Sequence, residues 1–190
     1  DDYETIAENI EADEDGWWKR SFEIPSSHQG DHEIDAQGED SSLGDVENAT
    51  FEVTPGISII DQASGSTIEE PSGSPGASIT MTGSGFYADD SYIKILFAGE
   101  EAETEPEIIR ADENGYWEAS FKVPERPKDT YSVTAEGKWT RKEDISALSF
   151  EIRAGLVLSP KEGHVGTNLT VTGGGFATNK NVVIKYDGSE

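Results

Sequence analysis

Two acidic segments of the chain have the residue types and spacing of a calcium ligand set. One begins at Asp13 and reads Asp-Glu-Asp-Gly, and the other begins at Asp112 and reads Asp-Glu-Asn-Gly. Side-chain oxygens at alternate positions before a glycine are how a calcium loop begins, so the candidate metal ligands are Asp13, Asp15, Asp112 and Asn114. The rest of such a loop, with its distal glutamate, is missing, and Asp-Gly and Asn-Gly are leading hairpin-turn signals. The hairpin interpretation is favoured, and calcium is the one cofactor left open.

Two Asn-X-Thr sequons, at Asn48 and Asn168, could carry N-linked glycans. In both, strand alternation points the asparagine away from the apolar face, where a glycan has room. Chance sequons are frequent in a threonine-rich chain, so a glycoprotein is a hypothesis and no more.

The remaining reactive residues predict no catalytic site. The three histidines, His28, His32 and His164, are too scattered along the chain for a metal triad, and none lies in a nucleophile motif. The glycine-rich segment 172–175 lacks the Lys-Ser/Thr ending of a phosphate loop. Trp17 and Trp139 remain as exposed platforms on which a sugar could stack. The prediction is that the protein is not an enzyme.

The composition of the chain restricts the classes of partner that it is expected to bind. The 190 residues include 39 acidic and 14 basic side chains, for a net charge of −25, and no cysteine. Such a field repels nucleic acid and anionic lipid, and stability must come from packed sheets without disulfides. No apolar run reaches the roughly 18 residues of a membrane helix, so neither nucleic-acid binding nor membrane insertion is expected.

The elements that position these residues follow from an internal repeat. Pairs 99 positions apart include Trp18 and Trp117, Phe22 and Phe121, and Phe51 and Phe150. A second block, residues 76–86, recurs as residues 166–176 at a spacing of 90 positions. The nine-residue difference is an insertion in Asp61 to Ser74, a Gly/Ser/Pro-rich stretch that predicts a loop.

The repeat unit has the pattern of short, half-buried strands. Trp117, Ala119, Phe121 and Val123 alternate with polar residues, which predicts one apolar face. Seven strands are predicted, with one helical turn between Thr140 and Ala147; the strands are 57–60, 77–82, 92–97, 108–111, 116–123, 130–135 and 146–153. This number of short strands with turn signals between them is typical of an immunoglobulin-like β-sandwich.

The segment from Ser159 to Thr167, followed by the glycine-rich residues 172–176, resembles the IPT/TIG group of immunoglobulin-like repeats. The turn at residues 112–124 and the segment 130–135 are similar to later strands of the same repeats. The resemblance covers most of the chain, and it implies a bacterial or archaeal cell-surface protein. Such repeats serve as spacers, stalks and filament subunits, so the resemblance supports the fold more than a function.

The phase of the repeat predicts three units: residues 56–153 form one complete domain, 1–55 the C-terminal half of another, and 154–190 an N-terminal half. Each half exposes apolar side chains, and the candidate assembly core is Trp18, Phe22, Ile24 and Phe51 on one half and Leu169, Val171, Phe176 and Val183 on the other. We expect the halves of neighbouring copies to complete each other head-to-tail, which builds a filament. Two alternatives are a fragment cut from a longer chain and closure of both halves within one chain.

The function that these observations favour is a structural subunit of an extracellular filament or cell-surface layer, whose partners are copies of itself. The alternative is an adhesin stalk or a carbohydrate-binding accessory module of a larger secreted protein.

Overall fold

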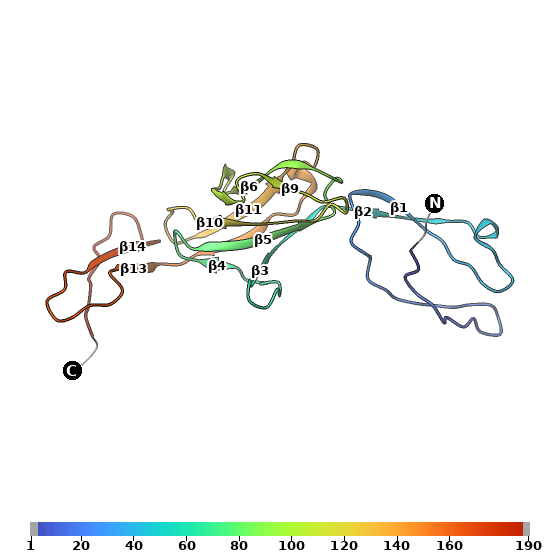
Figure 1. The fold of residues 1–190 in the computed structure, drawn as a ribbon, viewed down its shortest axis with the longest axis horizontal. Helices are drawn as coiled ribbons and strands as arrows, with labels where there is room; N and C mark the ends of the chain where they lie inside the picture. Colours follow the sequence, from blue (N-terminus) through green and yellow to red (C-terminus); the bar gives the residue numbers. More distant parts are fainter. Residues whose placement is uncertain (1–3, 188–190) are drawn as a thin grey trace.

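The computed structural model describes residues 4–187, so the outermost three residues of each predicted half-domain lie outside it. The molecule is elongated and nearly all β, with a central two-sheet sandwich between two smaller end pieces (Figure 1). In the described part of the chain there is no α-helix, and the only helical turns are η1 (Leu43–Asp45) and η2 (Lys142–Asp144). The helical turn predicted between Thr140 and Ala147 is therefore confirmed.

Two sheets form the central sandwich, and all seven predicted strands are present in them. The first sheet has the order β3 (Gly56–Ile60), β5 (Ser78–Ser84), β10 (Trp117–Lys122), β8 (Thr104–Glu105). The second has the order β4 (Ser72–Gly73), β12 (Leu148–Ile152), β11 (Thr130–Glu136), β6 (Ser91–Phe97), β7 (Glu100–Glu101), and β9 (Ile109–Arg110) also pairs with β6.

One hydrophobic core lies between the two sheets, and its buried members all fall between Ile57 and Ile152. The predicted alternation in β10 is confirmed, because Trp117, Ala119 and Phe121 are buried and the residues between them are not. Phe121 meets Phe97 and Phe150 from the opposite sheet, with ring centroids 6.2 Å away in both cases. Burial of these aromatic rings is the main stabilising term of the sandwich.

The insertion is more than the predicted loop. Its last residues form β4, which pairs in parallel with β12, Ser72 opposite Glu151 and Gly73 opposite Ile152. The chain therefore leaves the first sheet after β3, joins the edge of the second sheet for two residues, and returns to the first sheet as β5. A two-residue strand is too short to show an alternation, and for that reason the loop prediction was wrong at this point.

The end pieces fold as parts of the same unit. The N-terminal piece contains β1 (Gly30–Ile34) and β2 (Ala49–Val53), in which His32 pairs with Phe51; 99 positions later, Tyr131 pairs with Phe150. The C-terminal piece contains β13 (Gly155–Ser159) and β14 (Thr170–Gly174), whose register repeats that of β3 and β5 residue for residue. The turn η1 likewise corresponds to η2, so the repeat found in the sequence is a structural repeat.

The two end pieces lie at opposite ends of the sandwich (Figure 1). Closure of both halves within one chain would require them to meet, and in this structure they do not.

Candidate functional site

The joint between the N-terminal piece and the sandwich is short and tightly packed. Only Thr54 and Pro55 separate β2 from β3. Gly85 has φ +65°, and a Cβ there would lie 2.6 Å from the carbonyl oxygen of Thr54. The Gln29 N–H also donates to the Phe86 carbonyl oxygen at 2.9 Å. These contacts leave the joint little freedom to bend.

The joint at the other end of the sandwich repeats this geometry. Two residues separate β12 from β13, and Gly175 has φ +73°. A Cβ at Gly175 would lie 2.7 Å from the carbonyl oxygen of Arg153, which corresponds to Thr54 in the repeat. The Lys128 N–H, which corresponds to that of Gln29, donates to the Gly175 carbonyl oxygen at 3.1 Å. The glycine contact is therefore the same at both junctions, whereas the hydrogen bond from the corresponding N–H is accepted one residue earlier at the second.

The assembly candidates of the N-terminal piece are exposed. Trp18 is 53% exposed and Phe22 is 39% exposed, whereas their counterparts Trp117 and Phe121 are 2% and 1% exposed. Ile24 and Phe51 are exposed as well. The segment from Trp18 to Glu23, which corresponds to β10, forms no strand in the described part of the chain. An apolar surface of this kind marks an interaction site or an aggregation hazard.

The C-terminal piece exposes the matching surface. Leu169 and Phe176 are exposed and Val171 is half-buried, and Leu156 and Leu158 on β13 add to the same apolar area. Their counterparts in the sandwich belong to the core or pack against it.

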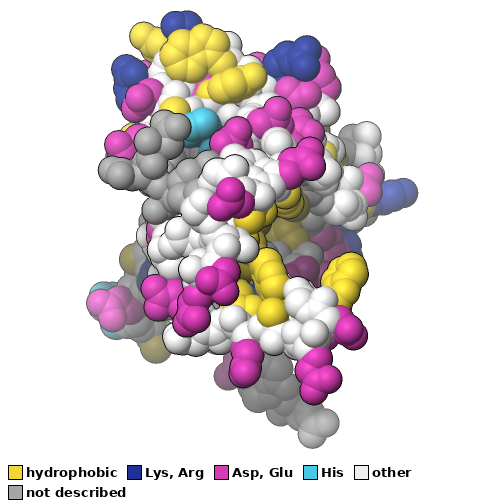
Figure 2. Space-filling model, turned by 90° about the vertical axis from the view of Figure 1, so that its right-hand side faces the viewer, with side chains coloured by type: hydrophobic (Ala, Val, Ile, Leu, Met, Phe, Trp, Pro, Cys, Tyr) yellow, Lys and Arg dark blue, Asp and Glu magenta, His cyan; other side chains and the backbone are white. Residues whose placement is uncertain are grey.

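Figure 2 shows the molecule from its N-terminal end, where hydrophobic side chains lie at the bottom of a hollow with acidic side chains around it.

Val183, the last assembly candidate, lies in a segment that forms no strand in the described part of the chain. Val182, Ile184 and Tyr186 share one side of the segment, whereas Val183 and Lys185 share the other. All of the apolar members of both sets are exposed. At the spacing of 90 positions Val183 corresponds to Ile93, which strand β6 buries in the core, and Lys185 corresponds to the buried Ile95.

The candidate calcium segments are hairpin turns. Asp112 Oδ1 accepts hydrogen bonds from the N–H groups of Asn114 and Tyr116, both at 2.9 Å. Asp13 Oδ1 makes the same two bonds, to the N–H groups of Asp15 and Trp17 at 3.0 and 2.9 Å. One carboxylate oxygen of each aspartate thus stabilises its own turn, as an Asx turn does. Within residues 4–187 no group of three or more His, Cys, Asp or Glu side chains is arranged to hold a metal ion.

Asp90 is a structural residue that the sequence reasoning missed. It is fully buried, and its carboxylate accepts hydrogen bonds from the N–H groups of Ser91, Trp139 and Thr140. The carboxylate therefore ties the loop before β6 to the loop after β11. Gly137 lies directly against this carboxylate and leaves no room for a side chain. The paired glycines Gly38 and Gly137 in the repeat were the available signal for this close approach.

The histidines and sequons lie at the surface. His28 and His32 come together, with ring centroids 5.1 Å apart, whereas His164 is in the other end piece. His32 Nε2 lies 2.8 Å from the His28 carbonyl oxygen, and the hydroxyl of its counterpart Tyr131 donates to the Pro127 carbonyl oxygen. Asn48 and Asn168 are both exposed, as a glycan requires, and Asn48 Nδ2 donates to Glu33 Oε2 at 3.2 Å.

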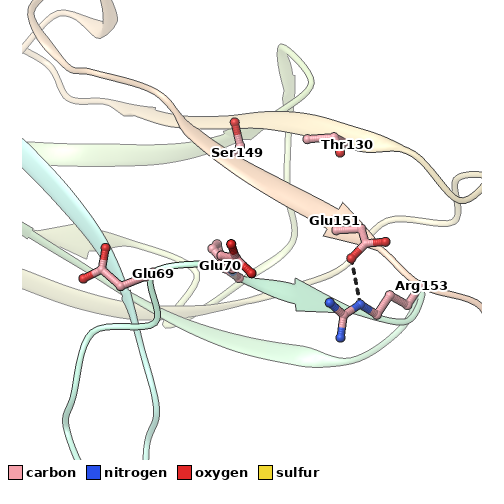
Figure 3. A pocket seen from close by; sticks show the side chains of 7 residues that line it. Glu69, Glu70, Thr130, Ser149, Glu151 and Arg153 are labelled. Carbon is pink, nitrogen blue, oxygen red and sulfur yellow. Dashed lines mark hydrogen bonds and ion pairs between the residues drawn. The ribbon is translucent and has the colours of Figure 1, made fainter.

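A shallow pocket lies where β4 meets the edge of β12 (Figure 3). It is lined by Glu69, Glu70, Pro71, Thr130, Ser149, Glu151 and Arg153. Arg153 Nε lies 2.8 Å from Glu151 Oε2, and this hydrogen bond lowers the pKa of the Glu151 carboxyl below its ordinary value.

Comparison with protein-family models, with curated proteins and with solved structures finds no match to this chain. No helix within residues 4–187 is long and apolar enough to cross a membrane.

Proposed function

We propose that the protein is an architectural subunit, a run of immunoglobulin-like β-sandwich repeats that joins head-to-tail into an extracellular filament or surface layer. The observation that carries the proposal is the repeated joint, in which Gly85 and Gly175 receive the backbone of Thr54 and Arg153 in the same way. Because linkers of two residues allow little bending, successive domains keep a constant relation and the array is a stiff rod.

The exposed ends support the same proposal. Each end piece repeats the strand register of the sandwich but leaves its apolar side chains open, so each is the natural complement of the other. A head-to-tail contact between unlike surfaces does not close on itself and continues indefinitely. The acidic surface, at a net charge of −25, keeps such a rod soluble. The resemblance to IPT/TIG repeats and the sequons at Asn48 and Asn168 fit a cell-surface glycoprotein.

Electron microscopy of the purified chain, combined with its intact mass, tests the proposal. Filaments built from chains of 20.6 kDa are expected. A compact monomer at all concentrations would contradict the filament and leave a spacer or binding module.

The second candidate is a carbohydrate-binding or stalk module, and one observation favours it. Trp17 is 76% exposed at the tip of a hairpin turn, where an indole ring can stack on a sugar. The Trp139 ring is less available, because Lys138 Nζ lies 4.5 Å from its centroid. Binding of a soluble polysaccharide by monomeric protein, with loss of binding in Trp17→Ala, would favour this function over the filament.

A further inference from the structure

We infer that the open edge of β14 is a docking site for residues 18–23 of a second copy, which add a strand to the first sheet in the register of β5 and β10. The inference rests on the proposed function and names the partner and contact that it requires. In the sandwich, Ser120 pairs with Thr80 and Phe121 pairs with Ile79. The corresponding pairs between copies are Ser21 with Thr170 and Phe22 with Leu169.

The two strands lack partners where the sandwich has them. Among residues 4–187 of one chain β14 pairs only with β13, whereas β5 pairs with both β3 and β10. The segment 18–23 forms no strand in the described chain. Backbone N–H and C=O groups at such an edge gain hydrogen bonds when a strand is added, and the alternate side chains provide specificity.

Gly173 shows which side chain the site receives. In the sandwich the Trp117 indole lies against Gly83 and leaves no room for a Cβ there. Trp117 also meets the Phe86 ring edge-on, with centroids 5.5 Å apart. The C-terminal piece has glycine at position 173 and phenylalanine at position 176, which correspond to Gly83 and Phe86. In the single chain the Phe176 ring lies over Gly173, 2.8 Å from the position of a Cβ, so the indole of Trp18 from the second copy would have to displace this ring to take the place that Trp117 has over Gly83.

A second strand pairing completes the same joint. Strand β6 pairs with β11 through Ile95 opposite Ala135 and Phe97 opposite Val133. The corresponding edge of the N-terminal piece is the open side of Ile34 and Ala36. At the spacing of 90 positions the residues of the other copy that correspond to Ile95 and Phe97 are Lys185 and Asp187, so this pairing would be made by the backbone. Both sheets of the composite domain are then continuous across the two chains.

Arg20 is the one member of the docking strand that departs from the pattern. Its counterpart is Ala119, which is 3% exposed in the core. A charged side chain at this position costs free energy on burial, so it weakens the joint. Arg20→Ala is accordingly expected to lower the protein concentration at which copies associate. Lys19→Ala is the matched control, because the counterpart Glu118 is exposed and the change should leave association unaltered.

Engineered cysteines test the register, and the chain has no other cysteine to interfere. The Oγ atoms of Thr80 and Ser120 are 3.3 Å apart, so a disulfide is geometrically suited to the matching pair between copies. The variant carries Ser21→Cys and Thr170→Cys. The control carries Ser21→Cys and Thr172→Cys, in which the second cysteine lies two residues away from the expected partner of Ser21. Both are made without glycans, because Thr170→Cys removes the Asn168 sequon. Oxidation should give a ladder of disulfide-linked oligomers for the variant and background only for the control.

The alternative outcomes overturn the inference in distinguishable ways. An internally crosslinked monomer would mean that both halves close within one chain. Equal ladders from variant and control would contradict the register. Filaments seen by microscopy without a disulfide would preserve the proposed function and overturn this docking site, whereas the absence of both filaments and disulfide would overturn the two together. A fall in association on Arg20→Ala would show that this face of the strand is not buried.

Discussion

The central sandwich and the two end pieces share one sequence pattern and one strand register, but they differ in burial. Ile59 on β3 is 1% exposed, and Leu158 at the same position on β13 is 40% exposed. The difference is not in the residues, which are equally apolar, but in whether a second sheet lies opposite them. Strand register is therefore a property of the individual hairpin, whereas a hydrophobic core requires both sheets.

The largest effect is expected when the equivalent tryptophan side chain is removed from each of the two regions. Trp117→Ala should lower the free energy of unfolding by about 3–5 kcal/mol, because it leaves a large cavity in a closed core. Trp18→Ala should change the stability of the dilute monomer by less than about 0.5 kcal/mol, as an exposed substitution does. Urea unfolding followed by circular dichroism measures both. A similar loss for the two variants would mean that the end piece has a core of its own.

A smaller effect is expected at Asp90, which is specific to the central sandwich. Asp90→Asn replaces one acceptor oxygen by an NH₂ group that cannot accept the backbone N–H bonds, and about 2–3 kcal/mol of stability should be lost. Asp89→Asn is the control, since Asp89 is exposed at φ +56°, a backbone conformation that asparagine tolerates well. Thermal unfolding of the two variants distinguishes them, and an equal Tm would contradict the structural role of Asp90.

The Asp90 site also predicts that a composite domain is weaker than the central one. Position 180, 90 residues after Asp90, is a lysine, although Gly38 still corresponds to Gly137. A joint between copies would lack the carboxylate that ties two loops together. The composite should therefore open before the central sandwich on heating, and calorimetry of assembled material should show two transitions.

The joints give a third test with a smaller effect on stability. Gly85→Ala and Gly99→Ala both place a side chain at positive φ, which should cost about 1–2 kcal/mol at Gly99 and at least that at Gly85. Only Gly85 has the neighbouring Thr54 carbonyl oxygen, whereas nothing lies within 4 Å of a Cβ at Gly99. Small-angle X-ray scattering should therefore show a changed maximum dimension for Gly85→Ala alone. An unchanged dimension would mean that the close approach at Gly85 does not determine the angle between the two units.

The parts of the fold and of the candidate site that could be predicted from the sequence are those whose pattern lies within a few neighbouring residues or recurs at a fixed spacing. The strands, the hairpin turns at Asp13 and Asp112, and the 99-residue repeat were predictable, because alternation and turn residues act over a few neighbouring positions. The immunoglobulin-like assignment and the assembly of halves remain predictions. Strand β4 was missed because two residues carry no periodicity.

Contacts between distant residues were the other gap. Asp90 receives hydrogen bonds from residues about fifty positions away, and nothing in its own neighbourhood distinguishes it from the exposed Asp89. The pairing of His28 with His32 depends on a bend of the chain before β1, which the spacing of the two residues does not reveal. Among the assembly candidates, Val183 was chosen by counting from the repeat, which places it at the position of the buried Ile93, and its role stays a prediction.

The smallest expected effect concerns pH and the pocket beside β4. The hydrogen bond from Arg153 lowers the pKa of Glu151 in the folded chain from its ordinary 4.5. A carboxyl with a lowered folded pKa stabilises the protein above that ordinary value and loses this contribution as the pH falls through the folded pKa. Glu151→Gln should therefore flatten the pH dependence of stability below pH 4.5, because it removes the titrating carboxyl. Arg153→Gln should also flatten it, because it removes the charged hydrogen-bond donor that lowers the Glu151 pKa. The change should be slight, because both side chains are partly exposed to solvent. The N-terminal piece has Glu52 but Thr54 at the corresponding positions, so Glu52→Gln removes a carboxyl that has no arginine two residues later and is the matched control. Urea unfolding of the three variants between pH 3 and pH 7, about the range over which carboxyls titrate, makes this comparison, and equal profiles for Glu151→Gln and the unaltered chain would show that the ion pair contributes nothing to the sandwich.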